Sequence, residues 1–104
     1  MIKTEDIIKI ASYFSIIAHS PGRLRVRVNP KIVKEGGNIS LKDIENLSEK
    51  ISGIKEIKIN KIIASVTIIY EPEIFKPHLW EDLVKNENID EISVLINNLA
   101  KEVI

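Results

Sequence analysis

Strict alternation of charged and apolar side chains in Arg23–Val28 constrains the fold of this chain more than any other feature. The stretch reads Arg-Leu-Arg-Val-Arg-Val and directly follows Pro21-Gly22, a pair typical of tight turns. Successive side chains of a β-strand point to opposite sides of the sheet. The sequence therefore predicts a strand with three arginines on one face and three apolar residues on the other, as in a half-covered antiparallel sheet.

The arginines of this strand invite two interpretations. Arg23, Arg25 and Arg27 are the only arginines of the chain, and arginine suits bidentate binding of carboxylates and phosphates. His19 precedes this row of arginines in the sequence. Together, the histidine and the arginines could hold an anion, a haem carboxylate or a phosphate, with Pro21-Gly22 supporting the site. Alternatively, the arginines are the ordinary solvent face of the sheet.

Composition narrows the classes of site that are possible. The 104 residues suit one domain, and 15 basic residues balance 15 acidic ones, so only a local basic site is expected and nucleic-acid binding is unlikely. The absence of cysteine excludes disulfides, thiolate metal sites, iron–sulfur clusters and cysteine nucleophiles. With two histidines, a metal site made by the protein alone would need carboxylates or a second subunit.

The N-terminal apolar run, residues 7–18, is interrupted by Lys9, Ser12 and Ser15. It is too short and too polar for a membrane-spanning helix, and it has no cleavage site typical of a signal peptide. We therefore expect a cytoplasmic protein that does not span the membrane.

Hydrophobic periodicity and turn residues predict the remaining elements. Ser40 and Asp43 resemble a capping box at the start of a helix that ends near Ser52-Gly53. Pro77 suits the first turn of a helix bearing Trp80, and Asn88 or Asp90 is expected to cap the last helix. The expected helices cover residues 5–13, 40–51, 77–84 and 89–103, and the expected strands cover 23–28, 54–59 and 64–70, with an extended run before Pro21.

This order predicts an α+β domain over residues 1–104, with a ferredoxin-like βαββα core at about 14–85 and extra helices at both termini. The fourth strand of that fold is expected to be missing, or hidden in the weak run Ile92–Ile96. One sheet edge would then be covered by a terminal helix or by another chain. An isologous homodimer would bury that edge and could bring two His19 side chains together.

Several motifs resemble one family. His19-Ser20-Pro21-Gly22-Arg23-Leu24-Arg25 is similar to the His-x-x-Pro-Gly-Arg-x-Arg opening of cysteine-free heavy-metal-associated-like domains, shortened by one residue. Ile51–Ile57 resembles the family's entry into its second strand. Ala64–Pro72 resembles its hairpin exit, with Ala64 where glycine is common. Such domains occur alone or at the N-termini of some heavy-metal-transporting P-type ATPases.

The resemblance implies a ferredoxin-like fold and a role near metal, iron or haem handling. The Cys-x-x-Cys copper loop of related domains does not carry over, because the chain has no cysteine. Our leading hypothesis is a non-catalytic accessory module that binds haem or a divalent metal through His19 and orients it with Arg23 and Arg25.

The other candidate residues have mainly structural interpretations. Tyr13 and Tyr70 are alternative oxygen ligands, although the alternation around Tyr70 places it in the core. His78 is expected at a helix start and Trp80 in the core. No catalytic Ser/His/Asp order, phosphate-binding loop or carboxylate pair stands out, so we expect no enzyme.

The competing hypothesis is a protein-interaction module without a small ligand. It would dock an acidic partner, such as a metal-transporting ATPase domain or a metal or iron storage compartment, on its arginine strand or open sheet edge.

Overall fold

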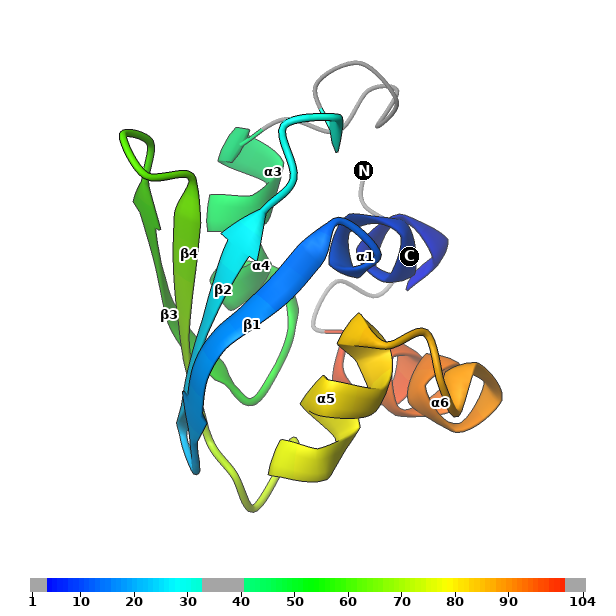
Figure 1. The fold of residues 1–104 in the computed structure, drawn as a ribbon. Coiled ribbons are helices and arrows are strands. Elements are labelled where there is room, and N and C mark those ends of the chain that lie inside the picture. Colours follow the sequence, from blue (N-terminus) through cyan, green and yellow to red (C-terminus); the bar gives the residue numbers. More distant parts are fainter. Residues whose placement is uncertain (1–3, 33–40, 101–104) are drawn as a thin grey trace.

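The chain alternates helices with antiparallel strands in a computed structural model that describes residues 4–32 and 41–100 (Figure 1). The elements, in chain order, are α1 (Thr4–Ala11), β1 (Phe14–Ser20), β2 (Arg23–Val28), α3 (Leu41–Glu45), α4 (Leu47–Lys50), β3 (Ile54–Asn60), β4 (Ser65–Tyr70), α5 (Pro77–Val84) and α6 (Ile89–Leu99). The structure is therefore α+β, as the sequence predicts.

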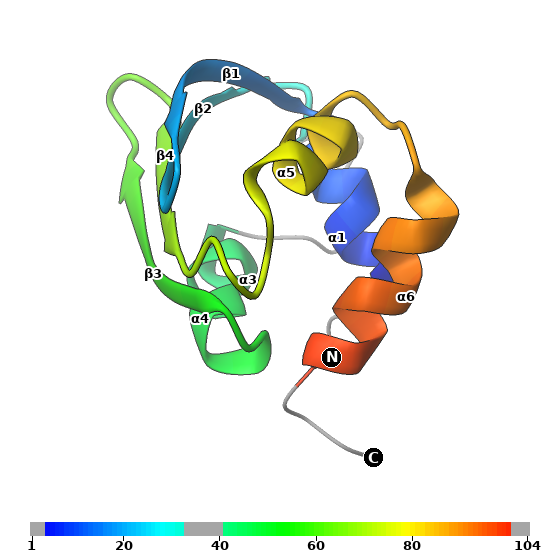
Figure 2. The ribbon, with the colours of Figure 1, turned by 90° about the horizontal axis from the view of Figure 1, so that it is seen from below.

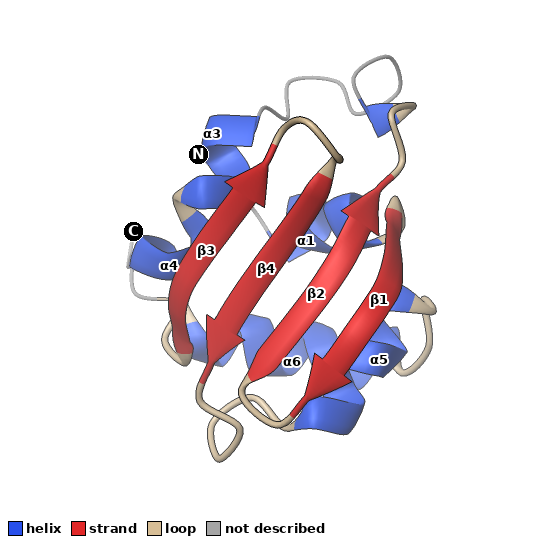
Figure 3. Cartoon of the chain, turned by 60° about the vertical axis from the view of Figure 1, so that its left-hand side comes forward, coloured by secondary structure: helices blue, strands red, loops and turns tan. Residues whose placement is uncertain are grey.

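The four strands form one sheet in the order β1-β2-β4-β3, and each neighbouring pair is antiparallel. It follows that β2 and β3 run parallel, with β4 between them, and that α3 and α4 connect them. Figures 1 and 3 show the labelled helices on one side of this sheet. None of the described helices covers the other side of the sheet, which we call the open face, and the arginine strand β2 is one of the two central strands.

The expectation of a missing fourth strand, or of one hidden in Ile92–Ile96, is wrong. The extended run before Pro21 is a full strand, β1, which pairs with β2 from Phe14↔Val28 to Ser20↔Arg23. Ile92–Ile96 lies inside α6, because Ile92 and Ile96 are one turn apart and both are buried. The strand that we expected to be missing is thus the chain's own N-terminal strand, which lies along β2.

The turn between β1 and β2 has the geometry expected from its sequence. Gly22 adopts φ +88°, which the third position of a type II turn requires, and Pro21 precedes it. A Cβ on Gly22 would lie 3.3 Å from the carbonyl oxygen of Tyr70, so β4 also packs closely against this turn. The short hairpin sets the register between β1 and β2, in which each arginine of β2 lies opposite a residue of β1.

The core lies between the sheet and the helices. Leu24 and Val26 of β2 and Val66 of β4 are fully buried, as the alternation predicts. Buried side chains of the helices cover them, and Figure 2 shows α1, α5 and α6 grouped on one side of the interior and α3 and α4 on the other. Large buried residues of these helices include Ile10, Ile44, Leu47, Leu79, Trp80, Leu83, Ile92 and Ile96.

Helix ends differ from expectation in two places. The helix expected over 40–51 is two short helices that meet at Asn46, and its capping pair, Ser40 and Asp43, falls outside the residues and side chains that the structure describes. Asn88 is the N-cap of α6, but it has φ +51° and its side chain donates to Asp82 (2.8 Å) instead of capping the helix. Within the described ranges, no helix has the length and apolarity needed to cross a membrane.

Candidate functional site

A β-bulge in β1 decides where His19 points. The pairing of β1 with β2 shifts between Ile16 and Ala18, so Ile17 is an extra residue without a cross-strand partner. Before the shift, Ile16 faces the core; after it, His19 pairs with Leu24, which is fully buried. Because directly opposed residues share a side of the sheet, His19 projects toward the helices.

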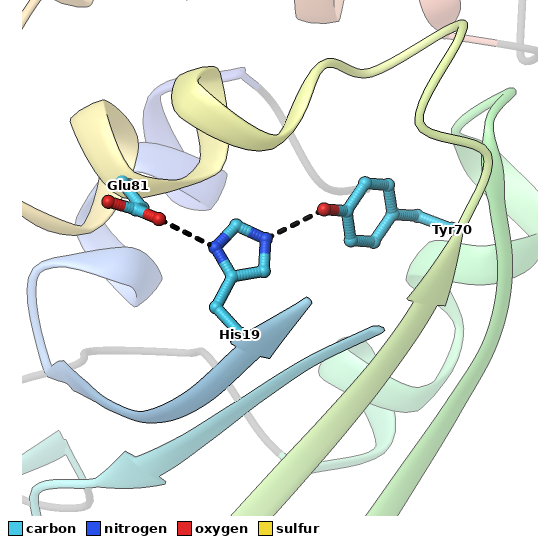
Figure 4. A network of polar contacts seen from close by, with 3 residues as sticks. All are labelled: His19, Tyr70 and Glu81. Atoms are coloured by element: carbon cyan, nitrogen blue, oxygen red, sulfur yellow. Dashed lines mark hydrogen bonds and ion pairs between the residues drawn. The ribbon is translucent and has the colours of Figure 1, made fainter. Parts of the chain in front are cut away.

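His19 is held there by two hydrogen bonds (Figure 4). Its Nδ1 lies 2.9 Å from Oε2 of Glu81 on α5, and its Nε2 lies 2.7 Å from the hydroxyl of Tyr70 on β4. The imidazole is 7% exposed, whereas Glu81 is 45% exposed and reaches it from the solvent side. The three side chains therefore link the edge strand, a central strand and α5.

Within this network, the phenol of Tyr70 has a shifted pKa. Burial raises the pKa of the Tyr70 phenol; a backbone hydrogen bond from Gly22 lowers it, and the charge of Glu81 raises it further. The Tyr70 O–H is in position to donate to Nε2 of His19, and an Nδ1–H of His19 is in position to donate to the Glu81 carboxylate. This arrangement gives every polar group of the network a partner.

The three arginines lie on the opposite, open face. Arg25 is flanked by Ala18 on β1 and Thr67 on β4, and its two companions likewise face small or apolar cross-strand neighbours on both sides. Within the described part of the chain, none of the three arginines forms an ion pair. The row is thus a line of cationic groups between uncharged cross-strand neighbours.

The rest of the open face adds little negative charge. On β3, Lys58 pairs with Thr67 of β4, and Glu56 pairs with Ile69 of β4. Strand β4 therefore separates Lys58 and Glu56 from the arginines of β2. Both strand aromatics, Phe14 and Tyr70, face the helices instead. The open face is therefore cationic and has no aromatic side chain on its described strands.

The structure does not bring His19 and the arginine row together. The imidazole lies under the sheet, beside α5, while Arg23, Arg25 and Arg27 lie on the other side of the same sheet. Pro21 and Gly22 form the turn directly after β1, and Gly22 contributes a backbone hydrogen bond to Tyr70. The imidazole and the arginines therefore do not face one another across a common site.

Metal or haem binding at His19 would require a change in the network. An imidazole nitrogen must be free to ligate, yet both nitrogens already have partners at hydrogen-bond distance. Among the described residues, no three His, Asp or Glu side chains are grouped to hold a metal ion. A metal at His19 would therefore displace Glu81 or Tyr70, and the ligand hypothesis stays a prediction.

The remaining candidate residues of the sequence differ in their burial. Tyr70 and Trp80 are buried, Tyr13 is half-buried and His78 is exposed near the start of α5. No sequence signal marks Glu81 as a partner of His19, since Glu81 is one of several acidic residues on helices. Only the bulge and the packing of α5 on β1 bring the two together.

Comparison of the chain with protein-family models, with curated proteins and with solved structures gives no match. The resemblance to heavy-metal-associated-like domains thus depends on the motifs of the sequence alone.

Proposed function

We propose that this protein is a non-catalytic binding module that docks an acidic protein segment on the arginine row of its open sheet face. The observation that carries the proposal is that Arg23, Arg25 and Arg27 share a face on a central strand and have no ion-pair partner among the described residues. Guanidinium groups in such a row offer paired donors to carboxylates at low conformational cost.

The fold supports a face-on rather than an edge-on mode of docking. Both edge strands, β1 and β3, contain a register shift, and bulges hinder the addition of another strand. Docking on the open face does not require a partner strand to pair with a bulged edge. We also favour protein over RNA, because RNA-binding sheets stack bases on aromatic side chains and this face presents none on its described strands.

We further propose that the fold is a variant of the ferredoxin-like fold, with one difference in connectivity. Its support is the β2–α–β3 unit with β4 between its strands, together with β1 in the outer position beside β2 that the C-terminal strand takes in the ferredoxin-like fold. We also propose that the acidic partner is a protein of metal or iron handling, as the sequence resemblance implies.

Binding of a fluorescent ten-residue polyglutamate peptide tests the docking face. We expect saturable binding at low salt that weakens as salt rises, because exposed charges are screened. Arg23→Glu combined with Arg25→Glu should weaken binding at least tenfold. Lys42→Glu combined with Lys85→Glu makes the same change in net charge at exposed helix-side positions and should alter binding less than about twofold.

Equal weakening by both pairs of substitutions would show that only net charge matters and would contradict the proposal. His19→Ala should leave peptide binding unchanged, because His19 lies on the other side of the sheet. Single-stranded RNA of matched charge should bind more weakly than the peptide; tighter binding of RNA would replace the proposed partner class.

A further inference from the structure

The turn between β3 and β4 exposes two adjacent isoleucines. Ile62 is 95% exposed and Ile63 is 44% exposed. Tight turns are normally built from glycine, proline, asparagine, aspartate and serine, and large apolar side chains are unusual there. Figure 1 shows this turn at one end of the sheet, away from α5 and α6. The apolar pair therefore projects from the molecule at a place where polar residues are the rule, which points to a contact with another surface.

Hydrogen bonds hold the turn in this shape. The backbone N–H groups of Ile62 and Ile63 both donate to the side-chain oxygen of Asn60, at 3.1 Å and 3.4 Å. The N–H of Val28, at the end of β2, donates to the carbonyl oxygen of Ala64 (2.8 Å). The turn is thus tied both to the last residue of β3 and to β2, so the isoleucines are presented on a fixed backbone.

The charged side chains around this apolar tip are positive. Lys61 belongs to the turn, and Lys31 belongs to the loop that follows β2; both are exposed, and neither forms an ion pair with a described residue. The two loops face one another across a hollow whose lining includes Pro30 and Lys61. Neither loop, over residues 29–32 and 60–64, contains an aspartate or a glutamate. The tip therefore combines protruding apolar groups with cationic neighbours.

This combination is complementary to the surface of an anionic membrane. Apolar side chains can enter the boundary between headgroups and acyl chains, while lysines beside them contact anionic headgroups. A second copy of the chain fits the tip less well, because a two-fold contact would bring the lysines of both copies together. A protein partner would need a pocket shaped for a protruding side chain, whereas lipid adapts to the shape that it meets.

We propose that the β3–β4 turn inserts Ile62 and Ile63 into the surface of an anionic lipid membrane, with Lys61 and Lys31 against the headgroups. The binding is reversible and of modest affinity, because two apolar side chains and a few cations hold a protein far less firmly than a spanning helix. The contact is separate from docking on the open face, where Arg23 and Arg25 lie opposite Ile69 and Thr67, well before the turn.

Sedimentation of the full chain with lipid vesicles tests the proposal. Phosphatidylcholine vesicles that contain about 30% phosphatidylserine should bind the protein at least tenfold more tightly than pure phosphatidylcholine vesicles. Ile62→Ser combined with Ile63→Ser should weaken this binding at least tenfold, because burial of one isoleucine side chain is worth about tenfold or more in an equilibrium constant. Ile17→Ser combined with Val94→Ser removes two other exposed apolar side chains and should change binding less than about twofold.

The contribution of charge has its own matched pair. Each lysine near an anionic membrane surface contributes about fivefold to binding, so Lys31→Glu combined with Lys61→Glu should weaken binding at least tenfold. Lys76→Glu combined with Lys85→Glu makes the same change in net charge at the two ends of α5, and both positions are exposed. This second pair should weaken binding less than about threefold.

Insertion itself is read from Ile62→Trp, whose fluorescence should shift to shorter wavelength with anionic vesicles, over a constant signal from the buried Trp80. The proposal is overturned if the double serine variant of the turn binds vesicles like the unmodified protein, or if Arg23→Glu combined with Arg25→Glu weakens binding more than it does. It is also overturned if vesicles do not bind and sedimentation velocity shows a dimer that the double serine variant dissociates. Because Ile62 is almost fully exposed, its substitution leaves the core untouched.

Discussion

Nδ1 of His19 lies 2.9 Å from the Glu81 carboxylate, and this contact joins the edge strand β1 to α5. It occupies the imidazole nitrogen that faces solvent, while Tyr70 occupies the nitrogen that faces the core. His19 is therefore best described as a residue that ties helix to sheet. The stability of the fold, rather than the binding of an anion, is the first property that should respond to changes here.

Tyr70→Phe should lower the free energy of unfolding by about 1–2 kcal/mol, because it leaves Nε2 of a nearly buried imidazole without a partner. Glu81→Gln should cost less than about 1 kcal/mol, since Glu81 is 45% exposed and water can replace it. Urea unfolding followed by circular dichroism measures both changes. A larger loss for Glu81→Gln than for Tyr70→Phe would contradict this ranking.

The raised pKa of Tyr70 predicts a loss of stability at high pH. The folded state holds the phenol proton more tightly than the unfolded state, in which tyrosine has its ordinary pKa of 10.0. The stability that this provides is fully present below that pH and is lost as pH rises through the folded-state pKa. The stability of the unmodified protein should therefore fall more steeply above pH 10 than that of Tyr70→Phe. Parallel stability curves for the two proteins would exclude this linkage.

Ala64 adopts φ +52° in the loop between β3 and β4, a conformation that favours glycine. Ala64→Gly should stabilise the protein by about 0.5–1 kcal/mol, because relief of roughly 1–2 kcal/mol of backbone strain exceeds the entropy cost of glycine. Thermal unfolding measures the gain. Ala18→Gly, at an exposed position within β1, is the control and should destabilise the protein.

Gly53 is the converse case. It has φ +95°, and a Cβ placed on it would lie 2.8 Å from Cγ2 of Ile74. Gly53→Ala should cost about 1–3 kcal/mol through strain and overpacking. Adding Ile74→Ala should recover part of that loss, whereas strictly additive effects in the double-mutant cycle would show that the clash contributes nothing.

The hypothesis of a ligand at His19 has a direct test. Haem and divalent metals, titrated with absorbance and calorimetry, should bind with a Kd below about 100 μM if the hypothesis holds, and His19→Ala should abolish the binding. We expect Glu81→Gln to strengthen such binding, because it weakens the competing hydrogen bond. Equal binding by His19→Ala would remove the ligand role.

Most elements could be predicted from local patterns. The alternation of Arg23–Val28 and the pair Pro21-Gly22 specify a strand and a turn without reference to the rest of the chain, and the structure confirms both. The helix from Pro77 and the burial of Trp80 follow from capping and periodicity in the same way. Such signals are contained in a few neighbouring residues, so a single sequence carries them.

The position of His19 could not be predicted, because it depends on pairing between strands. Simple alternation from Phe14, which faces the core, would place His19 on the same side as Ser15, among the arginines. The register shift after Ile16 reverses this, and only the pairing with β2 shows it. The role of β1 as the fourth strand likewise depends on contacts between segments rather than on its own composition.

The extra residue in β1 also makes this strand tolerant of changes in length. Ile17 has no cross-strand partner, so a chain from which it is deleted could keep Ile16 opposite Val26 and Ala18 opposite Arg25. Deletions elsewhere in a paired strand reverse the side of every residue that follows, unless another bulge compensates. Homologous sequences could therefore differ by one residue at this point and still direct the same histidine to the same glutamate, and alignments that forbid a gap here would misplace it.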